Sequence, residues 1–263
     1  MKIKHFLYNT FLIENEKIKI AIDPGLNMWL FKLGSLIPKS EWSSITHILV
    51  THGDPDHYWY TDKVAEAADA PVICGRKLVK EVGAETLLVA PRGKDIQYST
   101  HLEKVYPIDV GETVDLDDVK IEGLKAVHGP LVVKFFGLKL LNQKPDPGER
   151  VGLGAIGFKI NIGNKTIINL GDTLLQKEWE VLNPDILMIP IGGGEVVKNT
   201  MNVEDALEAV KLMSPKKVIP CHYNCAFFWQ RNANPADDEM FKREVEKMDI
   251  ECTIMKYGDE IFV

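Results

Sequence analysis

A short polar loop after an apolar run brings together four side chains that can bind metal ions. Residues 48–50 (Ile-Leu-Val) are typical of the end of a buried strand, and Gly53 and Pro55 predict a turn directly after it. The loop carries two imidazoles and two carboxylates within six positions: His52, Asp54, Asp56 and His57. Such groups are the usual ligands of Zn, Mn and Fe. Neighbouring side chains point in different directions, so one loop of this kind can serve two ions.

Further candidate ligands lie at the ends of other predicted strands. Runs of apolar residues end on a candidate ligand or on a group that can orient one at five places: Asp23, His52, His128, Asp172 and His222. In layered α/β folds, sites form outside strand ends, where loops converge on a rigid scaffold. A random scatter of the seven histidines would not follow this pattern. We interpret His5, His47 and His101, which do not follow it, as structural or surface residues.

The elements that must position these residues are strands and helices in alternation. We expect strands over 3–13, 18–22, 155–162, 165–170, 185–191 and 217–221. Helices are expected over 58–70, over 76–83, after the typical N-cap residue Asn202 and around 240–248. Two β-rich blocks, roughly 3–127 and 155–263, indicate two sheets packed together with helices outside.

No linker or low-complexity segment divides the chain, so residues 1–263 are predicted to form a single domain. Residues 130–153 are interpreted as an insertion that borders the site. The apolar segment 26–42 is either a lid or pocket wall, or a part of the core or of a subunit contact. A second apolar segment, 131–141, leaves open a contact with lipid.

The order and spacing of the candidate ligands resemble the metallo-β-lactamase superfamily. Its motif, His-x-His-x-Asp-His with a later His, Asp and His, is matched by His52-Gly53-Asp54-Pro55-Asp56-His57, then His128, Asp172 and His222. Pro190-Ile191-Gly192-Gly193-Gly194 and Thr200-Met201 further resemble the branch of metal-dependent hydrolases that includes ascorbate-phosphate lactonase-like proteins. The resemblance covers nearly the whole chain. It implies the α/β (α+β) class, as an αββα sandwich of two mixed β-sheets flanked by helices.

The resemblance also implies a dinuclear site for two divalent metal ions, Zn, Mn or Fe. One ion is expected to be held by His52, Asp54 and His128. The second is expected to be held by Asp56, His57 and His222, with Asp172 bridging the two. Asp56 and Asp172 are the expected catalytic residues, and Asp56 is also expected to accept a proton from the water between the ions.

Asp23 matches the family's early aspartate at a strand end. Its expected role is to accept a ring N–H from a ligand histidine and so fix the tautomer of that ring. The alternative is a turn residue before Pro24.

Asp54 departs from the family motif, which has histidine at this place. The substitution puts oxygen where nitrogen is usual and adds one negative charge. We therefore expect a weaker Lewis acid that favours harder ions such as Mn or Fe more than the usual site does. Diiron oxidoreductases of the superfamily carry a glutamate here, so an acid is compatible with a bound metal. The alternative is that one metal site is weak or empty.

The leading functional hypothesis is a metal-dependent hydrolase that acts on a lactone or a phosphoester. Paired ions lower the pKa of a shared water to about 7 and polarise the substrate oxygen. No Gly-x-Ser-x-Gly nucleophile elbow occurs, so serine hydrolysis is unsupported. The alternatives are a diiron-type oxidoreductase, whose relatives need a flavin partner domain for which this chain is too short, and a non-catalytic binding protein with a degraded metal site.

Three further features near the site have two interpretations each. Gly192, Gly193 and Gly194 either let a substrate approach the backbone or form a tight turn. Cys221 and Cys225 flank His222 without Cys-x-x-Cys spacing, which favours structural thiols over a redox or ligand role. Trp59 and Tyr60 are interpreted as helix packing rather than substrate stacking.

Composition excludes several classes of protein. The 263 residues are 45% hydrophobic and 26% charged, which is typical of a soluble globular chain. The net charge of −7 argues against nucleic acid as a partner, and no apolar run is long enough to span a bilayer. Residues 1–10 contain no long apolar h-region and no small-residue cleavage site, and four cysteines do not make a disulfide framework, so we expect a cytoplasmic protein. The expected partner is a small-molecule substrate, and a homo-oligomer is left open.

Overall fold

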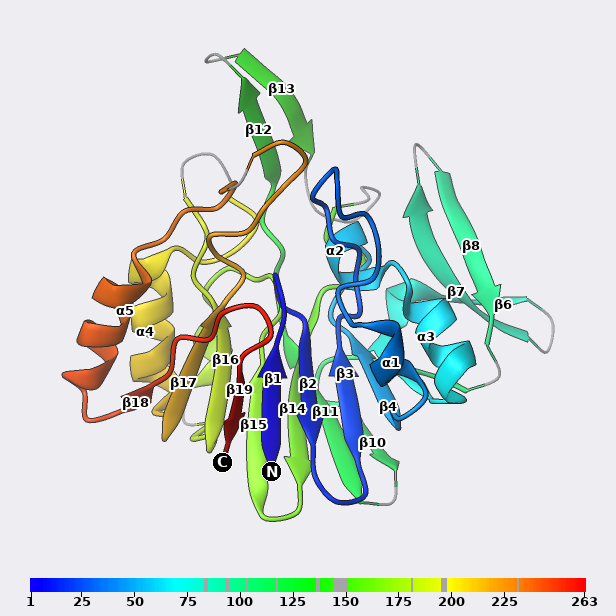
Figure 1. The fold of residues 1–263 in the computed structure, drawn as a ribbon, viewed down its shortest axis with the longest axis horizontal. Helices are drawn as coiled ribbons and strands as arrows, with labels where there is room; N and C mark the ends of the chain where they lie inside the picture. Colours follow the sequence, from blue (N-terminus) through cyan, green and yellow to red (C-terminus); the bar gives the residue numbers. More distant parts are fainter. Residues whose placement is uncertain are drawn as a thin grey trace.

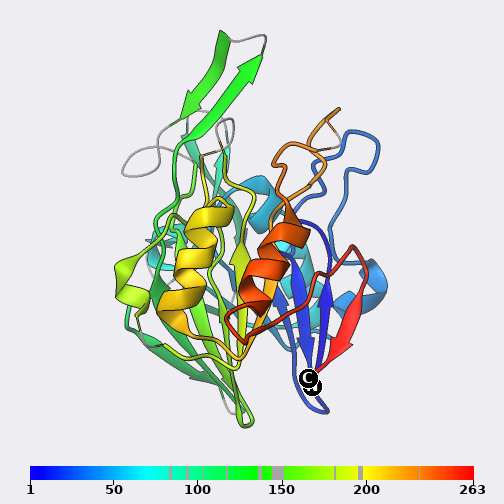
Figure 2. The same cartoon turned by 90° about the vertical axis from the view of Figure 1, so that its left-hand side faces the viewer.

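Two seven-stranded β-sheets pack against each other, and helices cover their outer faces (Figures 1 and 2). This arrangement comes from a computed structural model, which describes residues 1–82, 85–92, 95–102, 104–116, 118–135, 138–143, 151–180, 182–194, 198–230 and 232–263. The predicted fold class, an αββα sandwich of two mixed sheets, is confirmed. None of the helices in these ranges has the length and hydropathy that crossing a membrane requires.

The first sheet has the strand order β19-β1-β2-β3-β4-β5-β9. Its strands are β1 (Lys2–His5), β2 (Phe11–Glu14), β3 (Lys19–Ile22), β4 (His47–Val50), β5 (Val72–Gly75), β9 (Val105–Ile108) and β19 (Glu260–Phe262). The pairs from β19 to β3 are antiparallel, and those from β3 to β9 are parallel. The parallel strands β3 and β4 therefore end at the same edge of the sheet.

The second sheet has the order β10-β11-β14-β15-β16-β17-β18. Its strands are β10 (Thr113–Leu116), β11 (Val119–Lys125), β14 (Ile156–Ile162), β15 (Lys165–Asn169), β16 (Ile186–Pro190), β17 (Lys217–Cys221) and β18 (Glu251–Cys252). The pairs from β10 to β15 are antiparallel and those from β15 to β18 parallel. The predicted hairpin between β14 and β15 is confirmed, with Gly163 at a φ of 60° in its turn.

The helices in the described ranges are α1 (Lys39–Trp42), α2 (Pro55–Tyr58), α3 (Thr61–Ala68), α4 (Val203–Met213) and α5 (Asp238–Glu246), with 3-10 turns at Arg76–Leu78 and Lys177–Trp179. Helices α1 and α3 lie on the outer face of the first sheet and α4 and α5 on that of the second, whereas α2 lies at the end of the sandwich (Figure 1). As predicted, Asn202 caps α4, since its side chain accepts a hydrogen bond from the Asp205 amide at 2.8 Å. The apolar face of α4 is buried against the second sheet.

The core between the sheets consists of apolar side chains, mainly isoleucine, from both of them. Ile13, Ile20 and Leu49 of the first sheet share one cluster with Phe158 and Ile167 of the second, and all five are fully buried. Burial of this apolar surface is the main favourable term in folding. It also fixes the two sheets relative to each other, and hence the loops at their ends.

Two small sheets stand outside the sandwich (Figure 1). One contains β6 (Val79–Val82), β7 (Glu85–Arg92) and β8 (Asp95–His101). The other is a hairpin of β12 (Leu131–Phe135) and β13 (Leu138–Gln143), which falls within the segment 130–153 expected to be an insertion. Residues 136, 137 and 144–150 of that segment lie outside the described ranges. The single-domain assignment and the insertion stay predictions.

Three expectations about local structure differ from what is observed. The helix predicted over 76–83 is only one 3-10 turn followed by β6, because Val79 pairs with Leu88 of β7. The strand predicted over 3–13 is two strands with a turn between them, closed by a hydrogen bond from the Thr10 amide to the Leu7 carbonyl at 3.1 Å. The two sheets also exchange edge strands relative to the predicted blocks, since β10 and β11 join the second sheet and β19 joins the first.

His5 connects the first sheet to the C-terminal segment. Its burial predicts that the folded protein becomes less stable at acid pH. Its ring is buried, with Nδ1 3.1 Å from the Met255 carbonyl and Nε2 3.3 Å from the Tyr8 carbonyl. Burial lowers the pKa of His5 from 6.5 to about 4. Between about pH 6.5 and 4 the unfolded chain therefore binds a proton at His5 that the folded chain does not bind. The free energy of unfolding decreases as the pH falls through this range.

We expect this one group to cost the folded protein about 2 kcal/mol between pH 7 and pH 5. His5→Gln should remove that part of the pH dependence while keeping a hydrogen-bond donor. Urea unfolding of both proteins at the two pH values, with EDTA present throughout, measures the difference. Equal losses in the two proteins would show that His5 does not titrate in this way.

Candidate metal centre

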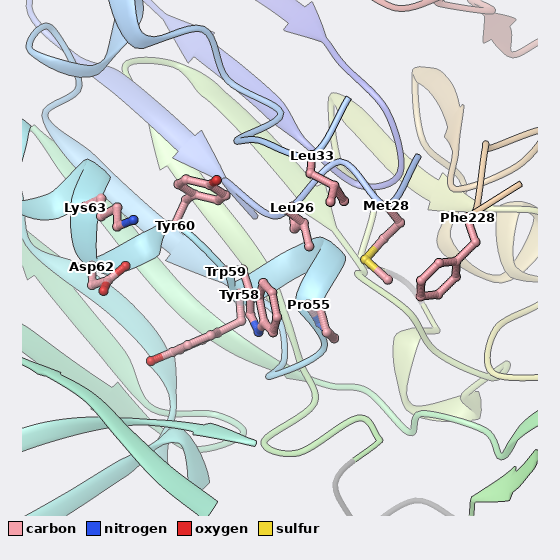
Figure 3. Close-up of a pocket in the computed structure, with 10 residues that line it drawn as sticks. All are labelled: Leu26, Met28, Leu33, Pro55, Tyr58, Trp59, Tyr60, Asp62, Lys63 and Phe228. Atoms are coloured by element: carbon pink, nitrogen blue, oxygen red, sulfur yellow. The ribbon is translucent and has the colours of Figure 1, made fainter. Parts of the chain in front are cut away.

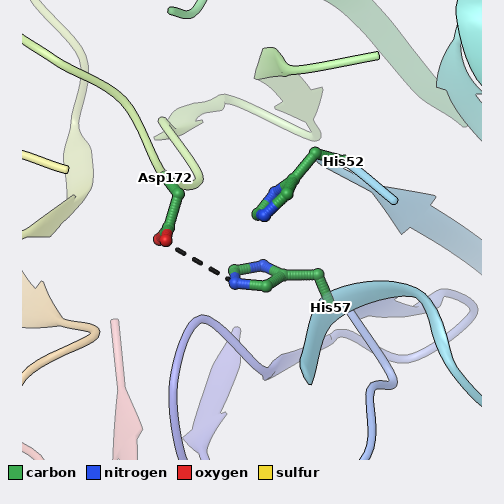
Figure 4. Close-up of side chains that lie close together, drawn as sticks. All are labelled: His52, His57 and Asp172. Carbon is green, nitrogen blue, oxygen red and sulfur yellow. Dashed lines mark ion pairs between the residues drawn. The ribbon is translucent and has the colours of Figure 1, made fainter. Parts of the chain in front are cut away.

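All the predicted ligands lie at one end of the sandwich, in loops that follow the carboxyl ends of strands. Asp23 follows β3, His52 follows β4, and His128, Asp172 and His222 follow β11, β15 and β17. Figure 4 shows His52 and His57 beside Asp172, although they come from opposite sheets. The side chains of His52, His57, His128 and Asp172 are 0–2% exposed.

The first group of ligand atoms comes from His52, Asp54 and His128, and these atoms lie within 4.8 Å of one another. The Asp54 Oδ2 atom is 3.5 Å from His52 Nε2 and 3.4 Å from His128 Nε2. The other oxygen of Asp54, Oδ1, accepts a hydrogen bond from the Gly152 amide at 2.8 Å. Asp54 therefore points into the cluster, and the segment that begins at residue 151 holds it there.

The second group comes from Asp56, His57 and His222, whose ligand atoms also lie within 4.8 Å of one another. Asp56 Oδ2 is 3.5 Å from His57 Nε2 and 3.4 Å from His222 Nε2. The two imidazole Nε2 atoms are 3.2 Å apart. His222 adopts a φ of 52°, and the Asn234 amide donates to its carbonyl at 2.6 Å, which fixes this uncommon backbone conformation.

Asp172 faces both groups. Its Oδ1 atom is 3.3 Å from His222 Nε2 and 3.8 Å from His57 Nε2. Its Oδ2 atom is 3.8 Å from His128 Nε2 and accepts a hydrogen bond from the Asn199 amide at 2.6 Å. One oxygen of Asp172 therefore faces each group of ligand atoms.

Three buried atoms at the centre of this cluster have no hydrogen-bond partner among the described residues: His52 Nε2, His128 Nε2 and Asp172 Oδ1. Buried polar atoms are almost always satisfied, because an unpaired one costs several kcal/mol. All three can donate a lone pair to a cation. The imidazole and carboxylate donors fit divalent ions such as Zn, Mn or Fe.

The acidic residues around the imidazoles give the site a negative field. Burial acts to lower the pKa of His57, but Asp56, Asp23 and Asp172 outweigh it and raise that pKa well above its usual value. Burial acts to raise the pKa of Asp56, but His57 and His222 outweigh it and hold that pKa well below its usual value. Four buried or half-buried carboxylates thus offset positive charge in this space, which suits a cation.

Asp23 lies behind His57 and orients it. The carboxylate is fully buried, and its Oδ2 atom accepts hydrogen bonds at 2.7 Å from His57 Nδ1, the Thr51 hydroxyl and the Asn9 amide. Its Oδ1 atom accepts the Thr51 backbone N–H at 2.7 Å. With Nδ1 donating to Asp23, the Nε2 lone pair of His57 faces the cluster. The contact expected from the sequence is present.

The polar residues that hold the ligands in place include several that sequence reasoning missed. Asn9 donates to Asp23 and to Asn169 of β15, at 2.7 and 2.9 Å, and so connects the two sheets beside the site. The side-chain amide of Asn199 donates to the Asp172 carboxylate, and that of Asn234 donates to the His222 carbonyl. Asparagine is common in turns, so no feature of the sequence distinguishes these residues.

The glycine run Gly192–Gly194 is closely packed at its first two positions. A Cβ on Gly192 would lie 2.1 Å from the His222 carbonyl oxygen, and one on Gly193 would lie 2.1 Å from that of Thr200. Gly194 has open space around the same position. The close packing explains two of the three glycines, and substrate binding by Gly192, Gly193 and Gly194 stays a prediction.

Comparison with known proteins agrees with this geometry. A family model described as a β-lactamase superfamily domain matches residues 2–222, which defines the class of protein. A UPF0173 metal-dependent hydrolase of Nanoarchaeum equitans is 31% identical in an alignment of 268 positions that covers 99% of each chain. A relative of the same description from Desulforamulus reducens is 29% identical and covers 94% of this chain and 92% of its own. The chain belongs to the UPF0173 family of metal-dependent hydrolases.

Solved structures share the fold at lower identity. Igni18, a metallo hydrolase from Ignicoccus hospitalis, superposes with a TM-score of 0.70 at 21% identity, covering 99% of this chain and 97% of its own. CmlA, a diiron β-hydroxylase from Streptomyces venezuelae, gives a TM-score of 0.67 at 14% identity and covers all of this chain but 54% of its own. These two likenesses concern the fold alone.

The network around Asp23 predicts how strongly that residue supports metal binding. Asp23→Asn keeps the shape and suits the φ of 48° at this position, but it removes the charge and puts an amide opposite donors. We expect a 10–100-fold loss of metal affinity. Titration of the EDTA-treated proteins with Mn and with Zn measures it.

Asp185→Asn is the matched control, since Asp185 accepts the Thr166 amide at 2.8 Å and belongs to none of the ligand groups. Its metal affinity should equal that of the wild type. An unchanged affinity in Asp23→Asn would remove Asp23 from the support of the site.

The position of Asp54 predicts a change in metal preference. Asp54→His exchanges a carboxylate for an imidazole beside His52 and His128, so Zn should gain over Mn relative to the wild type. Competition between the two ions for limiting protein provides the measurement, with the wild type in the same buffer. An unchanged preference would mean that Asp54 is not a ligand.

Proposed function

We propose that this protein hydrolyses a lactone or a phosphoester with two divalent ions held at the candidate metal centre. One ion would be held by His52, Asp54 and His128, and the other by Asp56, His57 and His222. Asp172 would bridge them, since its two oxygens face different groups. The observation that carries the proposal is the set of three buried atoms on His52, His128 and Asp172 that no described residue hydrogen-bonds.

Two ions in such a site supply a hydroxide nucleophile at neutral pH and polarise the oxygen of the bond to be broken. The chain's own residues would do the rest. Asp56 would accept the proton released there through its Oδ2 atom, which lies among the ligand atoms, 3.5 Å from His57 Nε2 and 3.4 Å from His222 Nε2. Asn199 and Asp23 would hold Asp172 and His57 at fixed angles to the substrate.

The substrate class rests on weaker support than the metal chemistry. The segments Pro190–Gly194 and Thr200–Met201 resemble ascorbate-phosphate lactonase-like proteins, which is why we include lactones. A diiron oxidoreductase is the alternative, and CmlA has the same fold. Membership in a family of metal-dependent hydrolases favours hydrolysis.

We also propose a cytoplasmic location and a small-molecule substrate. The cysteines Cys74, Cys221, Cys225 and Cys252 are free thiols and buried, which suits a reducing compartment. Burial raises the pKa of Cys74 and Cys225 to about 12, so these thiols are unreactive at neutral pH. This supports the structural interpretation of Cys225 beside the site.

The test combines metal analysis with a substrate panel. Protein purified without chelator should contain two ions per chain and should hydrolyse at least one member of a panel of lactones and phosphodiesters with Mn, Fe or Zn. His128→Ala and Asp172→Ala should each lose at least about 100-fold in kcat/KM, with the larger loss for Asp172, because both ions lose a ligand.

The fold should survive these changes, because both residues follow strands rather than lie within them. Circular dichroism checks this, and Asp185→Asn again serves as the control with normal activity. Metal content near zero that no added ion restores, or wild-type turnover in metal-loaded Asp172→Ala, would overturn the proposal.

A further inference from the structure

Beside α2 lies a groove of about 640 Å³, which we call the apolar groove (Figure 3). Its lining includes Leu26, Met28, Leu33, Pro55, Trp59 and Phe228. The volume falls within the range of about 300–1000 Å³ that is usual for small-molecule sites. We propose that the apolar groove binds an alkyl or aryl group of the substrate, which makes the substrate an ester, lactone or phosphoester with an apolar tail.

Two loops build the rim of the apolar groove, and hydrogen bonds connect them. The Phe228 amide donates to the Met28 carbonyl at 2.8 Å, and the Leu30 amide donates to the Phe228 carbonyl at 3.1 Å. Leu33 is 60% exposed and Phe228 38% exposed, so the rim presents apolar surface to water. A bound apolar group would remove that surface from water, which is favourable.

Two connections link the lining of the apolar groove to the second group of metal ligands. Pro55 lines the groove and directly precedes Asp56 in α2. At the other side, the Met28 amide donates to the Tyr8 hydroxyl at 3.3 Å, and the Tyr8 ring lies 5.8 Å from the His222 ring. The bond to be broken would lie at the metal centre, and the tail would extend between Met28 and α2.

The polar side chains of the lining gather away from Phe228. Figure 3 shows Asp62 and Lys63 at one end of the apolar groove and Met28 with Phe228 at the other. The half next to Tyr8 and His222 is therefore the apolar half. This favours a hydrocarbon tail over a sugar or a nucleotide, which would need several polar partners there.

Binding of n-alkanols from butanol to decanol tests the apolar groove without any reaction. Their displacement of the fluorescent probe 8-anilinonaphthalene-1-sulfonate should strengthen about fourfold with each added methylene. The measurement uses the full chain, both with EDTA and with Mn, because the groove contains none of the metal ligands.

Variants of the lining give the specific test. Phe228→Asp and Met28→Gln should each weaken decanol binding at least tenfold, and Asp suits the φ of 48° at Phe228. Phe31→Asp is the matched control, since Phe31 is 80% exposed on the same rim loop but does not line the groove. Binding without chain-length dependence, or an equal effect of Phe31→Asp, would overturn the proposal.

The other possible occupant of the groove is a second copy of the chain, and light scattering tests for such a dimer. If the wild type is a dimer that Phe228→Asp dissociates, the groove is an interface and the proposal is wrong.

The assignment of the tail to a substrate rests on the proposed function, and kinetics separate the two. In metal-loaded protein, γ-decalactone should have a KM at least tenfold below that of γ-butyrolactone, and Met28→Gln should abolish the difference. Equal KM values for the two lactones would contradict the binding of a substrate tail in the groove and would leave the proposed function intact. Absence of hydrolysis of every lactone and phosphoester would overturn the function, while alkanol binding still decides whether the groove takes an apolar group.

Discussion

The buried lone pairs at the end of the sandwich constrain this structure more than any other feature. Nitrogen and oxygen atoms of His52, His128 and Asp172 lie close together without a hydrogen bond from the described part of the chain, and each would cost free energy if it stayed unsatisfied there. Two cations held as proposed would satisfy all three atoms. The rest of the site, including the pKa shifts of Asp56 and His57, follows from placing acids and imidazoles around these atoms.

The two packed sheets position these ligand atoms relative to one another. The hydrophobic core fixes the two sheets against each other, and the ligands come from loops of both. Asn9 then connects the sheets at the site itself, because it donates both to Asp23 behind His57 and to Asn169 of β15. A small shift of one sheet would separate Asp172 from His57, so packing in the core contributes directly to the geometry of the ligands.

Helix α2 contributes residues to both the metal centre and the apolar groove, and this connects the proposed reaction to the proposed substrate. Asp56 and His57 point from this short helix to the ligand cluster, whereas Pro55 and Trp59 line the groove. A substrate with a polar reacting group and an apolar tail would contact both kinds of residue. The segment 26–42, for which the sequence left a pocket wall and core packing open, contributes to both, since Met28 lines the groove and Leu36 is buried in the core.

The sequence alone was enough to predict the fold class, because apolar runs and turn residues are local signals. The spacing of His and Asp singled out the side chains that the structure brings together at one end of the sandwich. The sequence also predicted the contact between Asp23 and a histidine. Only the tertiary structure decided the orientation of the neutral partners Asn9, Asn199 and Asn234, since their contacts are far apart in the chain. It likewise decided that residues 79–82 pair as a strand and that β19 joins the first sheet, because the hydrogen-bond partner of a strand is set by packing and not by its own residues.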